Sequence, residues 1–286
     1  MLLLTVTIWA LNFTVSKYIL DAGLGPLPYS SLRYSAAALV FIGLTYPRER
    51  SFRISRGDLP LVILAVLLLL TNQLSFVYAL DLTTATTAAL LFGTLPIFTA
   101  LISRLVGIER LGRRFWFAAS LSFAGVVLVT AGSGNSVSSN LGGDLLAVLG
   151  AATWGAYSVA ISPLMRRYSP FRLSAIFLAA VSVVLLTLAS PQLSDQSFDF
   201  GALVWVGFAF AVVGPLVLTN VLWFTAIDRV GPSRASVFAN LQPFLAAIIA
   251  LVLLDEQLTK AQVVGGLAIA AGILIARERR PPLPGE

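Results

Sequence analysis

The chain has 286 residues, of which 58% are hydrophobic and 11% charged, and its mean hydropathy is +0.90. A soluble domain carries roughly 25% charged residues, so this composition excludes a water-soluble globular protein. The formal net charge is +6 and cysteine is absent, which excludes disulfides and thiolate metal sites.

Ten apolar segments follow one another, each near the length of about 20 residues that crosses a bilayer as a helix. The segment LPLVILAVLLLLTNQLSFVYAL is the clearest example. The first segment continues past Trp9 and Asn12 for a full crossing, so we expect a transmembrane helix and no cleaved signal peptide. The predicted spans are 2–20, 28–46, 59–80, 85–106, 112–131, 143–164, 170–190, 201–226, 232–254 and 259–276.

The basic residues gather on one side of this ten-span topology. Sixteen of the nineteen lie around the loops after the second, fourth, sixth and eighth spans and in the tail after the tenth. Acidic residues dominate the loops on the other side, where Lys260 is the single cation. By the positive-inside rule, both termini are cytoplasmic. The excess of positive charge therefore reflects topology and does not indicate nucleic-acid binding.

The sequence also repeats itself. The stretches TLPIFTALISRLVGIE and LQPFLAAIIALVLLDE start 147 residues apart, and each has proline third and glutamate sixteenth. Trp9 and Trp154 are 145 residues apart. These offsets divide the chain into two five-span halves, 1–140 and 141–286. Because five is odd, the halves have opposite orientations, which is an architecture of transporters with a central, midplane site.

The glutamates that end these stretches follow the last apolar residue of their spans. We therefore expect Glu109 and Glu256 at the membrane surface. There each would cap the N-terminus of the next helix, where a carboxylate is favourable. A gating ion pair is the alternative.

The run ALDLTTATTAALLFGTLPIFTALISRLVGIERL, followed by AGVVLV, resembles the repeat of the drug/metabolite transporter superfamily in its ten-span, EamA-type exporter branch. The opening WALNFTVSKYILDAGLGPLPYSSLRY resembles that family's first repeat, with Trp9, Asn12, Lys17 and Arg33 in the usual places. The second half departs from the pattern, with Ser162 in place of a lysine and no counterpart of Arg33.

The resemblance covers essentially the whole chain and is closest in character to bacterial exporters of aromatic and other hydrophobic amino acids. It implies an all-α protein of the bacterial inner membrane. Such a protein exports small neutral or zwitterionic metabolites by alternating access. The expected partners are the substrate and the lipid bilayer; the oligomeric state is left open, and a monomer is consistent with this architecture.

Polar and aromatic residues inside the spans are candidates to line the cavity, because a polar group in the bilayer core is energetically costly and usually has a function. Amide groups would bind an amino acid's head group and aromatic rings its side chain. The alternatives are hydrogen bonds between helices and a place in the interfacial aromatic belt. The predicted substrate-binding residues are Trp9, Asn12, Phe13, Ser16, Asn72, Tyr78, Trp154, Tyr157, Ser158, Asn220, Trp223 and Asn240.

Prolines and glycines within the spans are candidates for motion. Pro96 and Pro243 occupy matching places in the fourth and ninth spans, and Gly214 and Pro215 interrupt the eighth. Membrane helices tolerate such breaks where neighbours satisfy the freed backbone groups. Hinges and static kinks are both consistent with the sequence.

Two basic residues, Lys17 and Arg33, lie inside predicted spans. Both are expected in the outer third, where a long side chain snorkels to the surface. Lys17 is also four residues before Asp21, which is a spacing for a local ion pair. Attraction of a substrate carboxylate from outside is the alternative role.

The sequence favours a carrier over a membrane enzyme or a sensor. Histidine is absent, and no embedded pair of carboxylates is available for acid–base or metal chemistry, so no catalytic residue, metal or cofactor is predicted. Nucleotide sugars and phosphate esters are alternative substrates, but they require cationic clamps that are not expected at the midplane. All thirteen acidic residues are placed at helix ends or in loops, which favours a uniporter.

The topology is testable in a chain that has no native cysteine. Cysteines introduced singly at Ser138 and Ser194 should react with an impermeant thiol reagent added to intact cells, because both loops are predicted to be external. A cysteine at Ser51 should react only after the membrane is opened. Labelling of Ser51→Cys in intact cells would reverse the predicted orientation.

Overall fold

The structure is a computed structural model that describes residues 1–132, 140–245, 248 and 259–276. These residues form helices and no strand, which confirms the all-α class, and seven helical stretches are long and apolar enough to cross a membrane. Ser138 and Glu256 lie outside the described residues.

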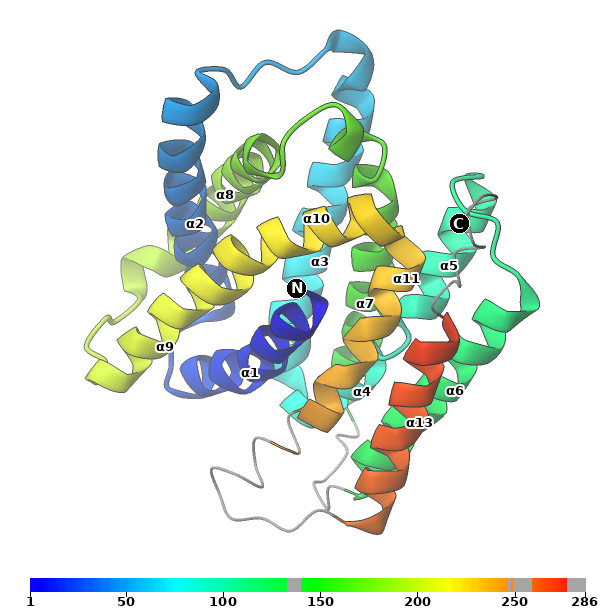
Figure 1. Ribbon diagram of the computed structural model, residues 1–286. Coiled ribbons are helices and arrows are strands. Elements are labelled where there is room, and N and C mark those ends of the chain that lie inside the picture. The colour runs from blue at the N-terminus through cyan, green and yellow to red at the C-terminus, as the bar shows by residue number, and fades with distance from the viewer. Residues whose placement is uncertain (133–139, 246–247, 249–258, 277–286) are drawn as a thin grey trace.

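The α-helices (Figure 1) are α1 (Leu2–Asp21), α2 (Pro26–Glu49), α3 (Leu59–Leu82), α4 (Ala85–Phe92), α5 (Leu95–Leu105), α6 (Arg113–Gly132), α7 (Leu141–Ile161), α8 (Pro170–Asp195), α9 (Ala202–Val212), α10 (Thr219–Val230), α11 (Pro232–Val237) and α13 (Lys260–Ala276). The short segments between them are η1 (Arg56–Asp58), η2 (Leu164–Arg166), the π-helical η3 (Val213–Leu218) and η4 (Phe238–Leu241).

Helix starts follow local sequence signals. α2 begins at Pro26 directly after Gly25, and α8 begins at Pro170 directly after Ser169. Proline suits the first turn of a helix because its missing N–H has no partner to lose there. The Ser169 hydroxyl accepts a hydrogen bond from the Arg172 backbone N–H and so caps α8.

Two helices extend further than predicted. The sequence analysis ended them at 46 and 190, just before Pro47 and Pro191, but α2 continues to Glu49 and α8 to Asp195. Proline lacks an N–H and its ring crowds the preceding turn, but the residues after it are free to complete a last helical turn. Both helices therefore run past the predicted span ends, α2 by three residues and α8 by five.

The predicted fourth span is broken into two helices. α4 ends at Phe92, α5 starts at Leu95, and Gly93 and Thr94 lie between them. The backbone groups of the break are satisfied locally: Gly93 N–H donates to the Leu90 carbonyl at 2.9 Å and Thr94 N–H to the Leu91 carbonyl at 3.1 Å. A Cβ at Gly93 would lie 2.8 Å from the Leu90 oxygen, so glycine permits this turn.

The prolines of the fourth and ninth spans start helical segments. Pro96 is the second residue of α5, and Pro243 is the second of the helical residues 242–245 that follow η4. Pro96 therefore does not kink a continuous helix. The rest of the predicted span 232–254 lies largely outside the described residues. Gly214 and Pro215 do interrupt the eighth span, as predicted, because they form part of the π-helical turn between α9 and α10.

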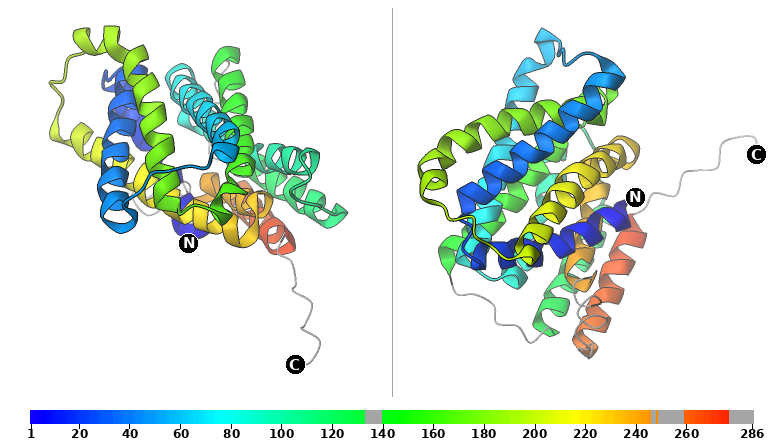
Figure 2. Two further views of the ribbon diagram at one scale, coloured as in Figure 1. Left: turned by 90° about the horizontal axis from the view of Figure 1, so that it is seen from above. Right: turned by 90° about the vertical axis from the view of Figure 1, so that its left-hand side faces the viewer.

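The largest apolar core lies among α2, α3, α7, α8 and α10. Its centre includes Phe41, Tyr157, Phe177, Trp223 and Phe224, each at most 1% exposed. Lipid tails are as apolar as these side chains, so close van der Waals packing rather than escape from water joins the helices. In Figures 1 and 2, α2 and α8 run side by side at one edge and α6 and α13 at the opposite edge, and both pairs pack extensively.

The outer surface is apolar. Large side chains more than half exposed include Leu39, Phe117, Leu203, Val206 and Leu267, which lie on four different helices. An exterior of this kind would be unstable in water and matches the hydrocarbon of a bilayer. The structure thus agrees with the composition on a membrane protein.

In the described part of the chain, contacts between loops join loops that the predicted topology places on the same side. Asp58, before α3, accepts hydrogen bonds from Arg167 Nη1 at 2.5 Å and from the Tyr168 hydroxyl at 2.7 Å, both near the start of α8. On the opposite side, Gly25 N–H donates to Gln196 Oε1 at 2.9 Å. These contacts tie helices of the first half to helices of the second.

Glu109 caps a helix, but not the next one in the chain. Its Oε2 accepts hydrogen bonds from the Ser103 hydroxyl at 2.9 Å, from Ser233 N–H at 3.2 Å and from the Ser233 hydroxyl. Ser233 lies in the first turn of α11, so the expectation of a cap on the following helix, α6, was wrong. The predicted local ion pair is present, with Lys17 Nζ 3.0 Å from Asp21 Oδ1.

Close packing of α6 against α13 depends on glycine. A Cβ at Gly125 would lie 2.6 Å from the Gly265 carbonyl oxygen and 2.7 Å from Ile269 Cγ1. Gly125→Ala should therefore lower the unfolding free energy by about 1–3 kcal/mol, which is typical of overpacking. Thermal unfolding in detergent measures the change.

Gly43→Ala is the matched control. Gly43 also lies within a helix, but nothing is within 4 Å of its Cβ position, so alanine should leave stability unchanged or raise it. Equal effects of the two substitutions would contradict the close contact between α6 and α13.

Candidate functional site

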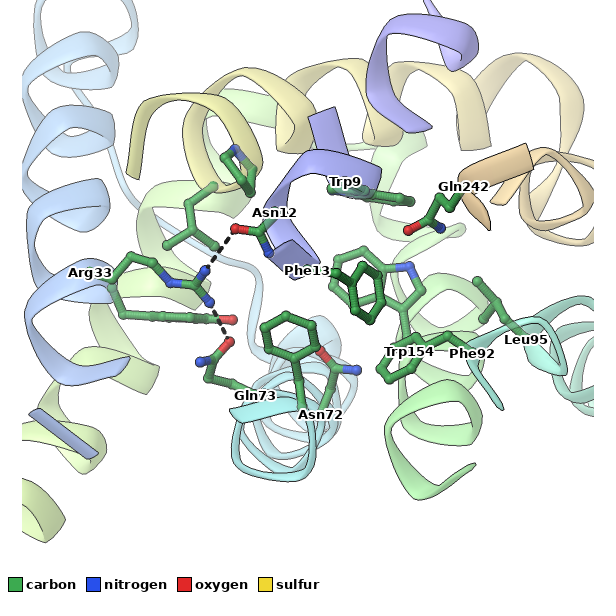
Figure 3. Close-up of a pocket in the computed structure, with 14 residues that line it drawn as sticks. Trp9, Asn12, Phe13, Arg33, Asn72, Gln73, Phe92, Leu95, Trp154 and Gln242 are labelled. Atoms are coloured by element: carbon green, nitrogen blue, oxygen red, sulfur yellow. Dashed lines mark hydrogen bonds between the residues drawn. The ribbon is translucent and has the colours of Figure 1, made fainter. Parts of the chain in front are cut away.

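A cavity lies among α1, α2, α3 and α7. The break between α4 and α5, the π-helical turn η3 and Gln242 after η4 also border it. The cavity holds about 580 Å³ of empty space, its open mouth included. The lining residues are Trp9, Asn12, Phe13, Arg33, Tyr34, Asn72, Gln73, Phe76, Phe92, Leu95, Trp154, Pro215, Leu216 and Gln242 (Figure 3).

One wall of the cavity is aromatic. The rings of Trp9 and Trp154 are 5.5 Å apart in an edge-to-face arrangement. Phe13 lies 5.4 Å from Phe76 and 5.5 Å from Phe92, again edge to face. Such pairs are favourable beyond their buried area, and together they present a rigid apolar surface.

The indole rings are fixed by hydrogen bonds from behind. Trp9 Nε1 donates to the Thr219 hydroxyl at 3.0 Å, and that hydroxyl donates in turn to the Pro215 carbonyl, at 2.5 Å, in the π-helical turn. Trp223 packs 4.9 Å from Trp9, and its Nε1 donates to the Ser158 hydroxyl at 3.2 Å. The aromatic wall therefore has a second layer that orients the first.

The other wall is polar. Arg33 is 2% exposed, and its guanidinium donates to Gln73 Oε1 at 2.8 Å and to Asn12 Oδ1 at 3.4 Å (Figure 3). Asn72 is held in place because its side-chain amide donates to the Gly150 carbonyl at 2.8 Å. Four polar side chains from α1, α2 and α3 thus converge on one side of the aromatic cluster.

The interrupted fourth and ninth spans border the same cavity. Phe92 ends α4, Leu95 begins α5, and both line the wall. Gln242, at the corresponding place after η4, lies across the cavity from Arg33 in Figure 3, and its buried Oε1 has no hydrogen-bond partner. Helix ends at a midplane cavity are where membrane transporters place their sites.

The structure brings five of the twelve predicted site residues to the cavity wall: Trp9, Asn12, Phe13, Asn72 and Trp154. Of the predicted hinge residues, Pro215 is also on the wall. That they contact a substrate stays a prediction.

The other seven predicted residues do not line the cavity. Tyr157, Ser158 and Trp223 are at most 1% exposed and support the aromatic wall from behind. Ser16 is buried beside Asn12 and the Tyr29 hydroxyl, Asn220 donates to the Leu216 carbonyl, and Asn240 donates to the Ser122 hydroxyl. Tyr78 packs against the apolar cluster that includes Phe13 and Phe76.

Arg33 is the lining residue that the sequence analysis misplaced. It was expected to reach the outer surface, but its side chain turns inward, where three neutral side-chain oxygens accept its hydrogen bonds. Tyr29, one helical turn earlier on α2, supplies one of these oxygens, and this spacing on a single helix face is the signal that could have indicated it. The lining residues outside the predicted set of twelve also include Tyr34, Gln73, Phe76, Phe92, Leu95, Leu216 and Gln242.

Comparisons with known proteins agree on a family. The profile of the EamA-like transporter family matches residues 1–131 and 141–277. The chain is 25% identical to the "Uncharacterized transporter YyaM" of Bacillus subtilis, over 93% of this chain and 88% of that one. It is 26% identical to the "Uncharacterized inner membrane transporter YedA" of Escherichia coli K12, over 87% and 81%.

Two further similarities concern substrate and fold. The chain is 26% identical to the "Probable terminal-alkyne amino-acid exporter" of Streptantibioticus cattleyicolor, over 97% of this chain and 92% of that one. A solved crystal structure, described only as that of a protein, superposes with a TM-score of 0.75 over 96% of both chains at 19% identity. The latter shows the fold alone.

Single cysteines can test whether the cavity is accessible. Phe92 lines it, whereas Ala88, one turn earlier on α4, is 0% exposed in the apolar core. In purified protein, Phe92→Cys should react with N-ethylmaleimide, and Ala88→Cys should stay unmodified until the protein is unfolded. Intact-mass measurement detects the adduct, and equal reactivity of the two thiols would argue against an open cavity at Phe92.

Proposed function

This chain belongs to the EamA-like transporter family, and we propose that it exports small zwitterionic metabolites, foremost aromatic and other hydrophobic amino acids, across the bacterial inner membrane by alternating access. Its family and its relatives are transporters, so a carrier function has direct support and an enzymatic one has none. The relative named as an amino-acid exporter supports the substrate class.

The observation that carries the proposal is the division of the cavity into an aromatic wall and a polar wall. Trp9, Trp154 and Phe13 offer ring faces and edges to an apolar side chain. On the other wall, the Arg33 guanidinium, held by Asn12 Oδ1 and Gln73 Oε1, offers N–H donors to a polar head group. An aromatic amino acid has this same division between its two ends.

Positions related by the repeat offset support an inverted pair of halves, 1–140 and 141–286. Trp9 and Trp154 both line the cavity, as do Leu95 and Gln242. Between α6 and α13, Gly125 lies against Gly265 and Gly272 against Ala118. The offset of 147 residues carries the first contact onto the second, which is the pattern of a two-fold relation. In alternating access, the halves would move about the site that they share.

Arg33 corrects one argument against anionic substrates. The sequence analysis expected no cation at the midplane, but the guanidinium lies on the cavity wall. It is the single basic side chain among the lining residues of the described chain. One guanidinium matches one carboxylate, whereas phosphate esters and nucleotide sugars carry more charge and call for further cations. Amino acids are therefore favoured over nucleotide sugars as substrates.

Uniport is part of the proposal. A proton-coupled carrier needs an ionisable group that is reached alternately from each side, and acidic side chains usually supply it. No acidic residue is among those that line the cavity in the described chain. Transport driven by the substrate's own gradient is consistent with this lining.

Exchange in proteoliposomes tests the function. Vesicles loaded with unlabelled L-tryptophan should accumulate labelled L-tryptophan by counterflow. Trp154→Ala should reduce the rate about tenfold, because one of the aromatic contacts is lost. Trp205→Ala is the matched control, since Trp205 is 38% exposed on α9 and lies outside the cavity lining.

Two outcomes would contradict the proposal. Absence of counterflow with every apolar amino acid would reject the substrate class. Accumulation that follows an imposed pH gradient, and that a protonophore abolishes, would reject uniport while leaving the carrier function intact.

A further inference from the structure

Arg33 is a buried cation without an anionic partner. Its side chain is 2% exposed, and no carboxylate of the described residues lies within ion-pairing distance of it. Nη2 donates to Gln73 Oε1 at 2.8 Å, and Nη1 donates to the Tyr29 hydroxyl at 3.1 Å and to Asn12 Oδ1 at 3.4 Å. The buried Nε has no hydrogen-bond partner.

This arrangement differs from the ion pairs elsewhere in the molecule. Arg172 Nη2 lies 2.7 Å from Glu49 Oε2, and Arg167 pairs with the buried carboxylate of Asp58. Burial of an unpaired charge is unfavourable even after the protein has relaxed. The ring of Tyr29, 4.8 Å from the guanidinium carbon, offsets a part of this cost by a cation–π contact.

The guanidinium also lies where a ligand can reach it. Arg33 is on the cavity wall, at one side of the aromatic cluster of Phe13, Phe92 and Trp154 (Figure 3). A carboxylate is planar and matches the fork of N–H donors on a guanidinium. A ligand with a carboxylate and an aromatic body would thus complete the charge pair and cover the aromatic wall at once.

The cavity offers no equivalent partner for a ligand's ammonium group. Its lining in the described residues has no carboxylate, and the unpartnered acceptor, Gln242 Oε1, is a neutral amide oxygen across the cavity from Arg33. We infer that the carboxylate, bound by Arg33, is the recognised group of the substrate and that the α-amino group is dispensable. Aromatic carboxylic acids without an amino group are then substrates of the same site. This inference rests on the proposed function in taking the cavity as the transport site.

Four probes with the same aromatic body test the inference: L-phenylalanine, 3-phenylpropionate, 3-phenylpropionamide and 3-phenylpropylamine. None contains indole, so the fluorescence of Trp9, Trp154 and Trp223 around the cavity reports their binding to the purified protein. The first two should bind with similar affinity. The amide and the amine should bind about 10- to 100-fold more weakly, the range of a hydrogen bond to a charged group.

Variants assign the preference to Arg33. In Arg33→Gln, the preference for 3-phenylpropionate over the amide should disappear, and Arg33→Lys should keep part of it. Arg48→Gln is the matched control, because Arg48 lies near the end of the same helix and outside the cavity lining, and its preference should be unchanged. The probe comparison in the unmodified protein needs no variant to fold.

The inference is overturned if the amide or the amine binds as tightly as 3-phenylpropionate, if none of the carboxylates binds, or if Arg33→Gln retains the preference. Its failure differs from failure of the proposed function. Counterflow of tryptophan with no preference for a carboxylate would reject the role of Arg33 alone. Tight binding of 3-phenylpropionate without amino-acid counterflow would reject the amino-acid function and leave the role of Arg33 standing.

Discussion

A helix that crosses a lipid bilayer must satisfy its own backbone hydrogen bonds, since the hydrocarbon supplies no partners. Interruptions are then tolerated only where protein or a polar cavity surrounds them. The break after Phe92 and the π-helical turn around Pro215 both obey this rule, and both border the cavity. Local hydrogen bonds from Gly93 and Thr94 close the first break. The cavity and the helix breaks are therefore two aspects of one constraint.

The site has two layers of residues: one lines the cavity, and the other holds the lining side chains in place. The rings of Trp9 and Trp154 present their surfaces to the cavity, but their orientation depends on Trp223, Ser158 and Thr219 behind them. On the polar wall, Asn12 and Gln73 hold the Arg33 side chain in an inward conformation. Preorganisation of this kind reduces the entropy that a ligand must lose when it binds.

The sequence was sufficient for features that depend on composition and period. Membrane class, helical fold, family and the apolar exterior all follow from long hydrophobic segments and a recognisable repeat. The sequence was insufficient where the role of a residue depends on the direction in which its side chain points. Tyr157 and Trp154 are three residues apart on α7, yet the first enters the core and the second the cavity wall. Depth along the helix suggested that Arg33 would reach the surface, whereas neutral hydrogen-bond acceptors on α1 and α3 turn it inward. Pro96 was predicted as a hinge or a kink within a span, whereas it lies in the first turn of α5.

The pairing of α6 with α13 has an evolutionary consequence. No described residue of either helix lines the cavity, and the two helices meet through small residues such as Gly125 and Gly265. Selection on these helices therefore acts on the size of the side chains and does not depend on which solute the cavity binds. Selection on α1, α2 and α3 concerns the chemistry of the site. A gene with this layout can diverge toward new solutes by changes in one set of helices while the other preserves the assembled fold.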